Sequence, residues 1–207
     1  MRLVILNNNP MNQKAYLYYH EGTKEGVLID PGYYPERILA TIAEHDVKLK
    51  MILLTHGHYD HITAASEIKT HTNAPIYSHK EEKPMLEDPA LNLSTRTKNK
   101  VSLSPDNLLA NENTLTLAGA SLEIIHTPGH TPGCVCYYDK DNDVIFTGDT
   151  LFKESVGRTD FPGGSREILT KSIKTKLFTL PEDVKVYPGH GDSTSIKHEK
   201  TYNPFVR

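Results

Sequence analysis

Short apolar runs, rich in β-branched and aromatic side chains, recur along the chain between turns that contain glycine, proline or asparagine. Runs of this length and composition predict β-strands. The short segment 21–23 joins the second and third of these strands as a hairpin. We expect strands over residues 3–6, 15–20, 26–30, 51–54, 75–78, 114–117, 121–125, 134–136, 144–146 and 184–187.

Helical spacing of apolar residues is less frequent. A helix is expected over residues 35–45, because Pro35 suits the first helical position and an apolar stripe follows it. Further helices are expected over 62–70 and 166–178. The segment 81–113 is polar and interrupted by prolines. Its basic stretch, 94–100, could lie over an anionic substrate, but charge runs usually face water, so a solvated loop is the simpler interpretation.

Composition describes an ordinary globular protein of 207 residues, with 37% hydrophobic and 24% charged positions. A net charge of -3 argues against a dedicated nucleic-acid binder. No apolar run approaches the roughly 18 residues of a membrane span. The apolar N-terminal run is also too short for a signal peptide, so a cytoplasmic location is expected.

The two cysteines, Cys134 and Cys136, flank one residue of a predicted strand. Positions i and i+2 place both thiols on one face with parallel Cβ directions, which is unfavourable for a disulfide between them. We therefore expect small, buried packing residues rather than a redox or metal-binding pair.

Three histidines and an aspartate fall within the stretch Thr55-His56-Gly57-His58-Tyr59-Asp60-His61, directly after the predicted strand 51–54. Ligand sites in open α/β sheets commonly lie at the carboxyl ends of strands. Gly57 gives the backbone freedom for two neighbouring rings to converge, and clustered histidine and aspartate side chains are typical of metal ligands. The later pair, Asp60 and His61, points another way, which suggests two adjacent metal positions. A surface loop that happens to be rich in histidine is the alternative.

The second half of the chain repeats the plan of a strand, a glycine turn and then a histidine or aspartate. This pattern places His130, Asp149 and His190 after three further strands. Each turn alone is ordinary, but their recurrence predicts that several strands deliver ligands to one end of the sheets. Asp30, at another strand end, could support the metal site from behind or could simply form a turn.

These residues, in this order, resemble the metallo-β-lactamase fold superfamily over about residues 30–191. The resemblance implies an α/β fold, an αββα sandwich of two mixed β-sheets with helices on the outer faces. It also implies the metal ligands. His56, His58 and His130 would bind the first ion, Asp60, His61 and His190 the second, and Asp149 would bridge both.

Within this superfamily the chain is similar to short bacterial proteins related to glyoxalase II, the hydroxyacylglutathione hydrolases. The similarity rests on the stretches 127–133, 148–152 and 157–164. Long glyoxalase II enzymes have a Lys-x-Tyr pair near the position of Arg158 and a C-terminal helical domain that grips glutathione. This chain has neither, so we expect one domain over residues 1–207 without that helical domain.

The resemblance implies hydrolysis of a small-molecule thioester, S-lactoylglutathione or a related thiol ester, by a hydroxide shared between two divalent ions. Zinc is expected, with iron or manganese as alternatives. Asp60 and Asp149 could orient the hydroxide in addition to binding metal. Because a thiol leaves readily, no separate general acid is needed.

Other functions stay open. The stretch 157–161 also resembles the persulfide dioxygenases, which would use His56, His130 and Asp149 around one iron. A non-catalytic metal-binding module is the third possibility.

The substrate's carboxylate is expected near the start of the helix 166–178. Arg158 and the first backbone amides, at Gly164 and Ser165, are candidates for binding it. The alternative is structural: Ser165 would cap the helix and Arg158 would pair with Asp160.

Overall fold

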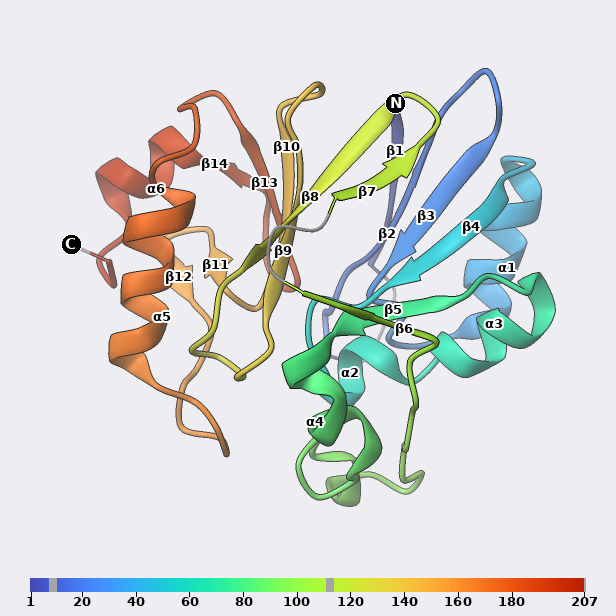
Figure 1. Cartoon of the computed structure of the whole chain (residues 1–207), viewed down its shortest axis with the longest axis horizontal. Coiled ribbons are helices and arrows are strands. Elements are labelled where there is room, and N and C mark those ends of the chain that lie inside the picture. The colour runs from blue at the N-terminus through green and yellow to red at the C-terminus, as the bar shows by residue number, and fades with distance from the viewer. Residues whose placement is uncertain (8–10, 111–113, 207) are drawn as a thin grey trace.

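Two mixed β-sheets pack face to face in the computed structural model, which describes residues 1–7, 11–110 and 114–206 (Figure 1). Within these residues each sheet has six strands. The first has the order β1 (Arg2–Leu6), β2 (Ala15–Tyr19), β3 (Glu25–Ile29), β4 (Lys48–Leu53), β5 (Ile76–His79) and β6 (Asn107–Leu109). The second has the order β14 (Thr194–Ser195), β13 (Lys185–Pro188), β10 (Val144–Gly148), β9 (Val135–Asp139), β8 (Ala120–His126) and β7 (Thr114–Leu117).

Both sheets combine antiparallel hairpins with parallel strands. In the first, β3, β4, β5 and β6 are parallel, and in the second β10 is parallel to β13. A small ribbon, β11 (Leu151–Phe152) with β12 (Ser155–Val156), follows β10. Because the parallel strands end at the same edge of their sheet, the segments that follow them gather there.

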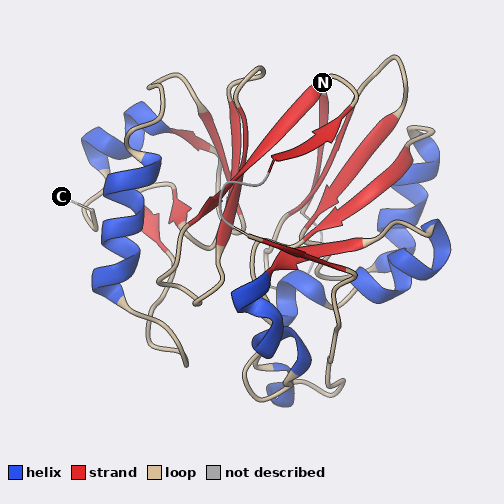
Figure 2. Ribbon diagram, in the orientation of Figure 1, coloured by secondary structure: helices blue, strands red, loops and turns tan. Residues whose placement is uncertain are grey.

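Helices cover the outer faces (Figure 2). On the first sheet lie α1 (Pro35–Glu44) and α3 (Ala65–Thr72), and on the second lie α5 (Arg166–Ser172), its π-helical continuation Ile173–Leu177, and α6 (Ile196–Tyr202). Near the ends of β4 and β5 lie α2 (Tyr59–Ile62), the 3₁₀ turn Lys80–Glu82, α4 (Lys83–Glu87) and a second 3₁₀ turn, Ser94–Arg96. The predicted αββα sandwich is confirmed.

Alternate residues of the central strands belong to different cores. In β2, Tyr16 and Tyr18 pack between the sheets, whereas Leu17 packs against the helices of the first sheet. In β9, Tyr137 faces the other sheet and Cys136 faces α5 and α6. Strands with both faces covered are apolar throughout, which explains why their sequences show runs rather than alternation.

Several boundaries differ from the sequence-based expectation. The predicted helix 62–70 is two helices, α2 and α3, because the amide of Ala64 donates to the carbonyl of Pro31 (2.9 Å) instead of continuing α2. The predicted helix 166–178 changes to π geometry at Ile173. The segment 81–113, of which residues 111–113 lie outside the described part, is more ordered than expected and contains α4 and the edge strand β6.

Cys134 and Cys136 are buried free thiols, as predicted. In the described part of the chain, no helix combines the length and the apolar character that crossing a membrane requires.

Candidate metal centre

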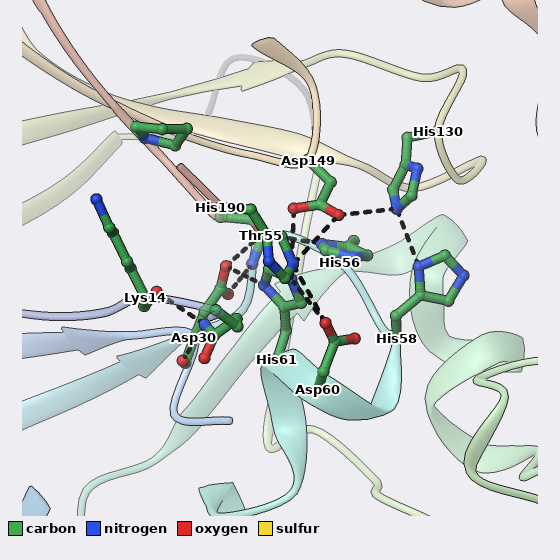
Figure 3. Close-up of polar contacts among 12 residues, drawn as sticks. Lys14, Asp30, Thr55, His56, His58, Asp60, His61, His130, Asp149 and His190 are labelled. Carbon is green, nitrogen blue, oxygen red and sulfur yellow. Dashed lines mark hydrogen bonds and ion pairs between the residues drawn. The ribbon is translucent and has the colours of Figure 1, made fainter. Parts of the chain in front are cut away.

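The predicted ligands come together at the edge where strands of both sheets end (Figure 3). The stretch after β4 supplies four of them, His56, His58, Asp60 and His61, the last two from α2. The second sheet supplies the other three: His130 from the loop after β8, Asp149 directly after β10, and His190 two residues after β13. Five of the seven side chains are buried, and Asp149 and His190 are partly exposed.

Hydrogen bonds fix the orientation of four histidine rings. Nδ1 of His61 donates to Oδ2 of Asp30 (2.9 Å), and Nδ1 of His130 donates to the carbonyl of Arg158 (2.7 Å). Nδ1 of His190 donates to the carbonyl of Met11 (3.2 Å). The Thr55 hydroxyl donates to Asp30 (2.6 Å), which leaves its oxygen free to accept from Nδ1 of His56 (3.1 Å).

In its neutral form, each of these four rings therefore has its proton on Nδ1 and a lone pair on Nε2 that points into the centre. Metal-binding histidines typically use their second nitrogen in this way. His58 is reversed, with Nδ1 facing Nε2 of His130 at 2.9 Å. Two ring nitrogens so close repel each other unless a proton or a cation lies between them.

The ligand atoms form two groups around a shared carboxylate. His56, His58 and His130 make the first group, and Asp60, His61 and His190 the second, with the ligand atoms of each within 4.8 Å of one another. Oδ2 of Asp149 lies 3.6 Å from Nε2 of His130 in the first group. Its Oδ1 lies 3.3 Å from Nε2 of His61 in the second. Asp149 thus stands between the two groups.

Burial and charge act differently on the two groups. Burial alone would lower the pKa of His61 and His190, but the carboxylates Asp149 and Asp60 outweigh it and both pKa values are raised, so metal binding at the second group would displace protons. Burial lowers the pKa of His56 and His130, and it lowers the pKa of His58 to about 3, so these rings are neutral at neutral pH. Burial alone would raise the pKa of Asp149, but the neighbouring His61 outweighs it, and the pKa is lowered. Neutral imidazoles and ionised carboxylates are the forms that bind metal.

The centre fits divalent metal ions by a further observation. Nε2 of His56 is buried and has no hydrogen-bond partner among the described residues. An unpaired buried polar atom costs about 1–3 kcal/mol, and an ion in the first group would satisfy this one. Histidine nitrogens with carboxylate oxygens suit zinc, iron or manganese better than they suit calcium or magnesium.

A cavity of about 460 Å³ opens in front of the two groups. Its walls include Tyr59, Leu93, Phe152 and Phe161, and its charged residues beyond the ligands are Arg96 and Arg158. Both guanidinium groups lie over the Phe161 ring, at 5.1 Å for Arg96 and 4.0 Å for Arg158.

The predicted carboxylate-binding residues are engaged with one another. Arg158 forms a two-point ion pair with Asp160. The Gly164 amide donates to the carbonyl of Phe161 (2.9 Å), and the Ser165 amide donates to that of Gly129 (2.8 Å). Ser165 also caps α5, since its hydroxyl accepts from the Ile168 amide (3.4 Å). Neither of these two backbone amides is a free donor, and Arg158 alone of the three lines the cavity.

Two further clusters of possible ligands occur in the part of the chain that the structure describes. Asp30 with His56 and His61 overlaps both groups, whereas His79, Glu81 and His126 lie apart from the cavity lining. The two rings stack at 4.2 Å with an angle of 20° between their planes. Nitrogens of nearly parallel rings point along parallel planes instead of converging, so the stacking serves packing.

Two polar residues of the centre's surroundings were not assigned such a role from the sequence. Glu82 is fully buried behind the first group, although it lies in a segment whose polarity indicates a surface loop. Arg96 comes from the basic stretch that was interpreted as solvated. For Arg96, the only sequence feature that could have indicated a role near the centre was its position in the basic stretch. For Glu82, the sequence contains no such feature.

Sequence comparison agrees with this geometry. The family model of the metallo-beta-lactamase superfamily matches residues 8–190. Hydroxyacylglutathione hydrolase GloC of Haemophilus influenzae is 39% identical over 209 residues, which cover 100% of this chain and 98% of that protein.

Solved structures are similar over almost the whole chain. The BLEG-1 B3 metallo-beta-lactamase superposes with a TM-score of 0.94 at 39% identity, covering 99% of both chains. TTHA1623 in a di-iron-bound form superposes with a TM-score of 0.84 at 36% identity, covering 99% of this chain and 100% of that one. ETHE1 of Myxococcus xanthus gives 0.82 at 31% identity, covering 99% of this chain and 84% of that one. From its family match, its relatives and its paired ligand groups, the chain belongs to the metallo-beta-lactamase superfamily.

Proposed function

We propose that this protein is a binuclear metallohydrolase that cleaves the thioester of S-lactoylglutathione or of a related 2-hydroxyacyl thiol. The observation that carries the proposal is the set of four histidines whose Nδ1 protons are engaged outside the centre, so that their Nε2 atoms face Asp149 and one another. The likeness to a hydroxyacylglutathione hydrolase over the full chain supports the choice of substrate.

In this proposal His56, His58 and His130 hold one ion, Asp60, His61 and His190 hold the other, and Asp149 bridges them. Two divalent ions so placed would lower the pKa of a shared water to about 7 and polarise the carbonyl of a bound ester. Oδ2 of Asp60 lies 3.2 Å from Nε2 of His190, on the same side of the centre as Asp149. Both carboxylates could therefore accept a proton from that water or orient it.

The remaining side chains of the cavity orient the substrate. Phe152, Phe161 and Leu93 supply an apolar wall for the acyl group and the sulfur. Arg96 makes no hydrogen bond or ion pair with its guanidinium among the described residues, so it is available to a substrate carboxylate. Arg158 stays a candidate for the same role, in competition with Asp160.

The resemblance of residues 157–161 to the persulfide dioxygenases keeps that activity as the alternative. Such an enzyme would need one iron held by His56, His130 and Asp149. The second group disfavours this alternative. Hydrogen bonds from Nδ1 orient His61 and His190 just as they orient rings of the first group, and these two side chains would then have no ion to bind.

Metal analysis and two parallel assays separate these functions. Purified protein would be analysed for zinc, iron and manganese, then assayed for hydrolysis of S-lactoylglutathione and, with glutathione persulfide, for oxygen uptake. Two ions per chain with hydrolysis and no oxygen uptake would support the proposal. One iron per chain with oxygen uptake would replace it with the dioxygenase. Two ions with neither activity would exclude both substrates.

A further inference from the structure

Glu82 is a fully buried carboxylate in the 3₁₀ turn after β5, wedged between the two loops that carry the first ligand group. Oε1 accepts from the Gly57 amide (2.8 Å). Oε2 accepts from the Gly133 amide (2.8 Å) and from the Thr131 hydroxyl (3.0 Å). One side chain thus joins a loop of the first sheet to a loop of the second.

Both loops are shaped to receive this carboxylate. A Cβ atom at position 133 would lie 2.4 Å from the backbone nitrogen of Glu82 and 2.6 Å from its Oε2. At position 57 a Cβ would meet Oε1 at 3.3 Å and the Met85 side chain at 3.1 Å. Glycine at both positions lets the two backbones approach Glu82 closely enough for direct hydrogen bonds.

The three bonded residues are neighbours of ligands in one group only. Gly57 separates His56 from His58, and Thr131 directly follows His130. No bond from Glu82 reaches a residue next to Asp60, His61 or His190 among the bonds of the described residues. Asp30, the other buried carboxylate behind the centre, serves both groups: it accepts from Nδ1 of His61 and from the Thr55 hydroxyl, which contacts Nδ1 of His56.

We propose that Glu82 is the positioning residue of the first metal position: by tying the His56–His58 loop to the His130 loop, its carboxylate sets the affinity of that position without touching the ion. This proposal rests on the proposed function only in requiring the two ligand groups to bind ions.

The test is metal binding by the Glu82→Gln variant. Glutamine has nearly the same shape but only one acceptor oxygen, so it cannot accept from both glycine amides, and its NH2 group faces one of them. Outer-shell changes of this kind typically weaken metal affinity by about 10–100-fold. Titration of the metal-free protein with Zn²⁺ in a calorimeter should show two tight equivalents for the wild type, but one tight and one weakened equivalent for Glu82→Gln.

A double variant assigns the weakened equivalent to a position. His190→Ala removes a ligand of the second group and should leave one tight ion. Adding Glu82→Gln should then weaken that remaining ion by the same factor. Glu81→Gln, a neighbour on the same turn with a half-exposed side chain, is the matched control and should bind two ions as tightly as the wild type.

Thr131→Val provides a second variant in case Glu82→Gln does not fold. It removes one of the three hydrogen bonds at nearly constant volume and should weaken the same equivalent by a smaller factor. Unchanged affinities in folded Glu82→Gln, or an equal loss at both positions, would overturn the proposal. Should the wild type bind only one ion, the binuclear function fails, but the role of Glu82 fails only if Glu82→Gln binds that ion equally well.

Discussion

Arg158 and Asp160 form a two-point ion pair at the mouth of the cavity, with Nε 2.8 Å from Oδ1 and Nη2 2.6 Å from Oδ2. This geometry uses the fork with which an arginine would bind a carboxylate. Side chains of both residues are more than half exposed, so the pair itself adds little stability. The ion pair does mean that Arg158 must leave Asp160 before it can bind an anionic substrate, whereas Arg96 can bind one directly.

We therefore expect Arg96→Ala to raise KM for S-lactoylglutathione more than Arg158→Ala does. Loss of a charge-assisted hydrogen bond costs about 1.5–3 kcal/mol, which is about 10–150-fold in KM if the contact is equal in ground and transition states. Steady-state kinetics on thioesters with and without the glutathione carboxylates would measure it. An equal effect of Arg96→Ala on both thioesters would contradict the role, and Lys100→Ala, in the same basic segment, is the control.

His58→Ala and Asp60→Ala are each expected to abolish hydrolysis while the protein stays folded. The two residues belong to different ligand groups and lie in the turn after β4 and at the start of α2, outside the three apolar cores. Activity, metal content and circular dichroism of each variant would be measured together. Near wild-type turnover by either one would exclude the binuclear mechanism.

Removing the metal ions should lower the melting temperature. An ion that binds only the folded state stabilises it by about 2.7 kcal/mol when its concentration is 100 times its Kd. Thermal unfolding with and without a chelator, followed by addition of Zn²⁺, would show the loss and its recovery. A chelator that strips the ions but leaves the melting temperature unchanged would mean that the ligand loops are equally ordered without them.

Both thiols should resist alkylation at pH 8 until the protein unfolds. Burial raises the pKa of Cys136 to about 11 and raises that of Cys134 as well, so neither thiolate is available. Because the folded state holds these protons more tightly, their stabilising contribution is complete below the unfolded value near 8.5 and is lost as the pH rises towards 11. Labelling rates in buffer and in denaturant, with stability measured from pH 8 to 10, would test both statements; rapid native labelling would contradict them.

Much of the site was predictable because its ligands follow strands at short distances along the chain. Asp149 comes directly after β10, and His190 follows β13 by two residues, so the strand ends alone predict that they meet. The central strands β2, β9 and β10 were detectable because both of their faces are covered, which makes nearly every position apolar.

Features that depend on distant partners were not predictable. The break between α2 and α3 exists because Pro31 offers its carbonyl to Ala64, a contact made by a different segment of the chain. Glu82 is buried by the two loops that donate to it, and its own surroundings in the sequence are those of a surface turn. The Arg158–Asp160 pair was recognised as a possibility, but only the fold shows that Arg96, which lies on the same Phe161 ring, forms no comparable two-point ion pair among the described residues.

Each candidate metal position takes ligands from both sheets: His130 joins His56 and His58 at one, and His190 joins Asp60 and His61 at the other. An ion at either position would therefore act as a cross-link between segments 72 to 130 residues apart in the chain, such as His58 and His130 or Asp60 and His190. Cross-links across long segments restrict the unfolded chain most. The concentration of free metal ion would then set not only the activity of this protein but also the rate at which its two sheets separate during unfolding.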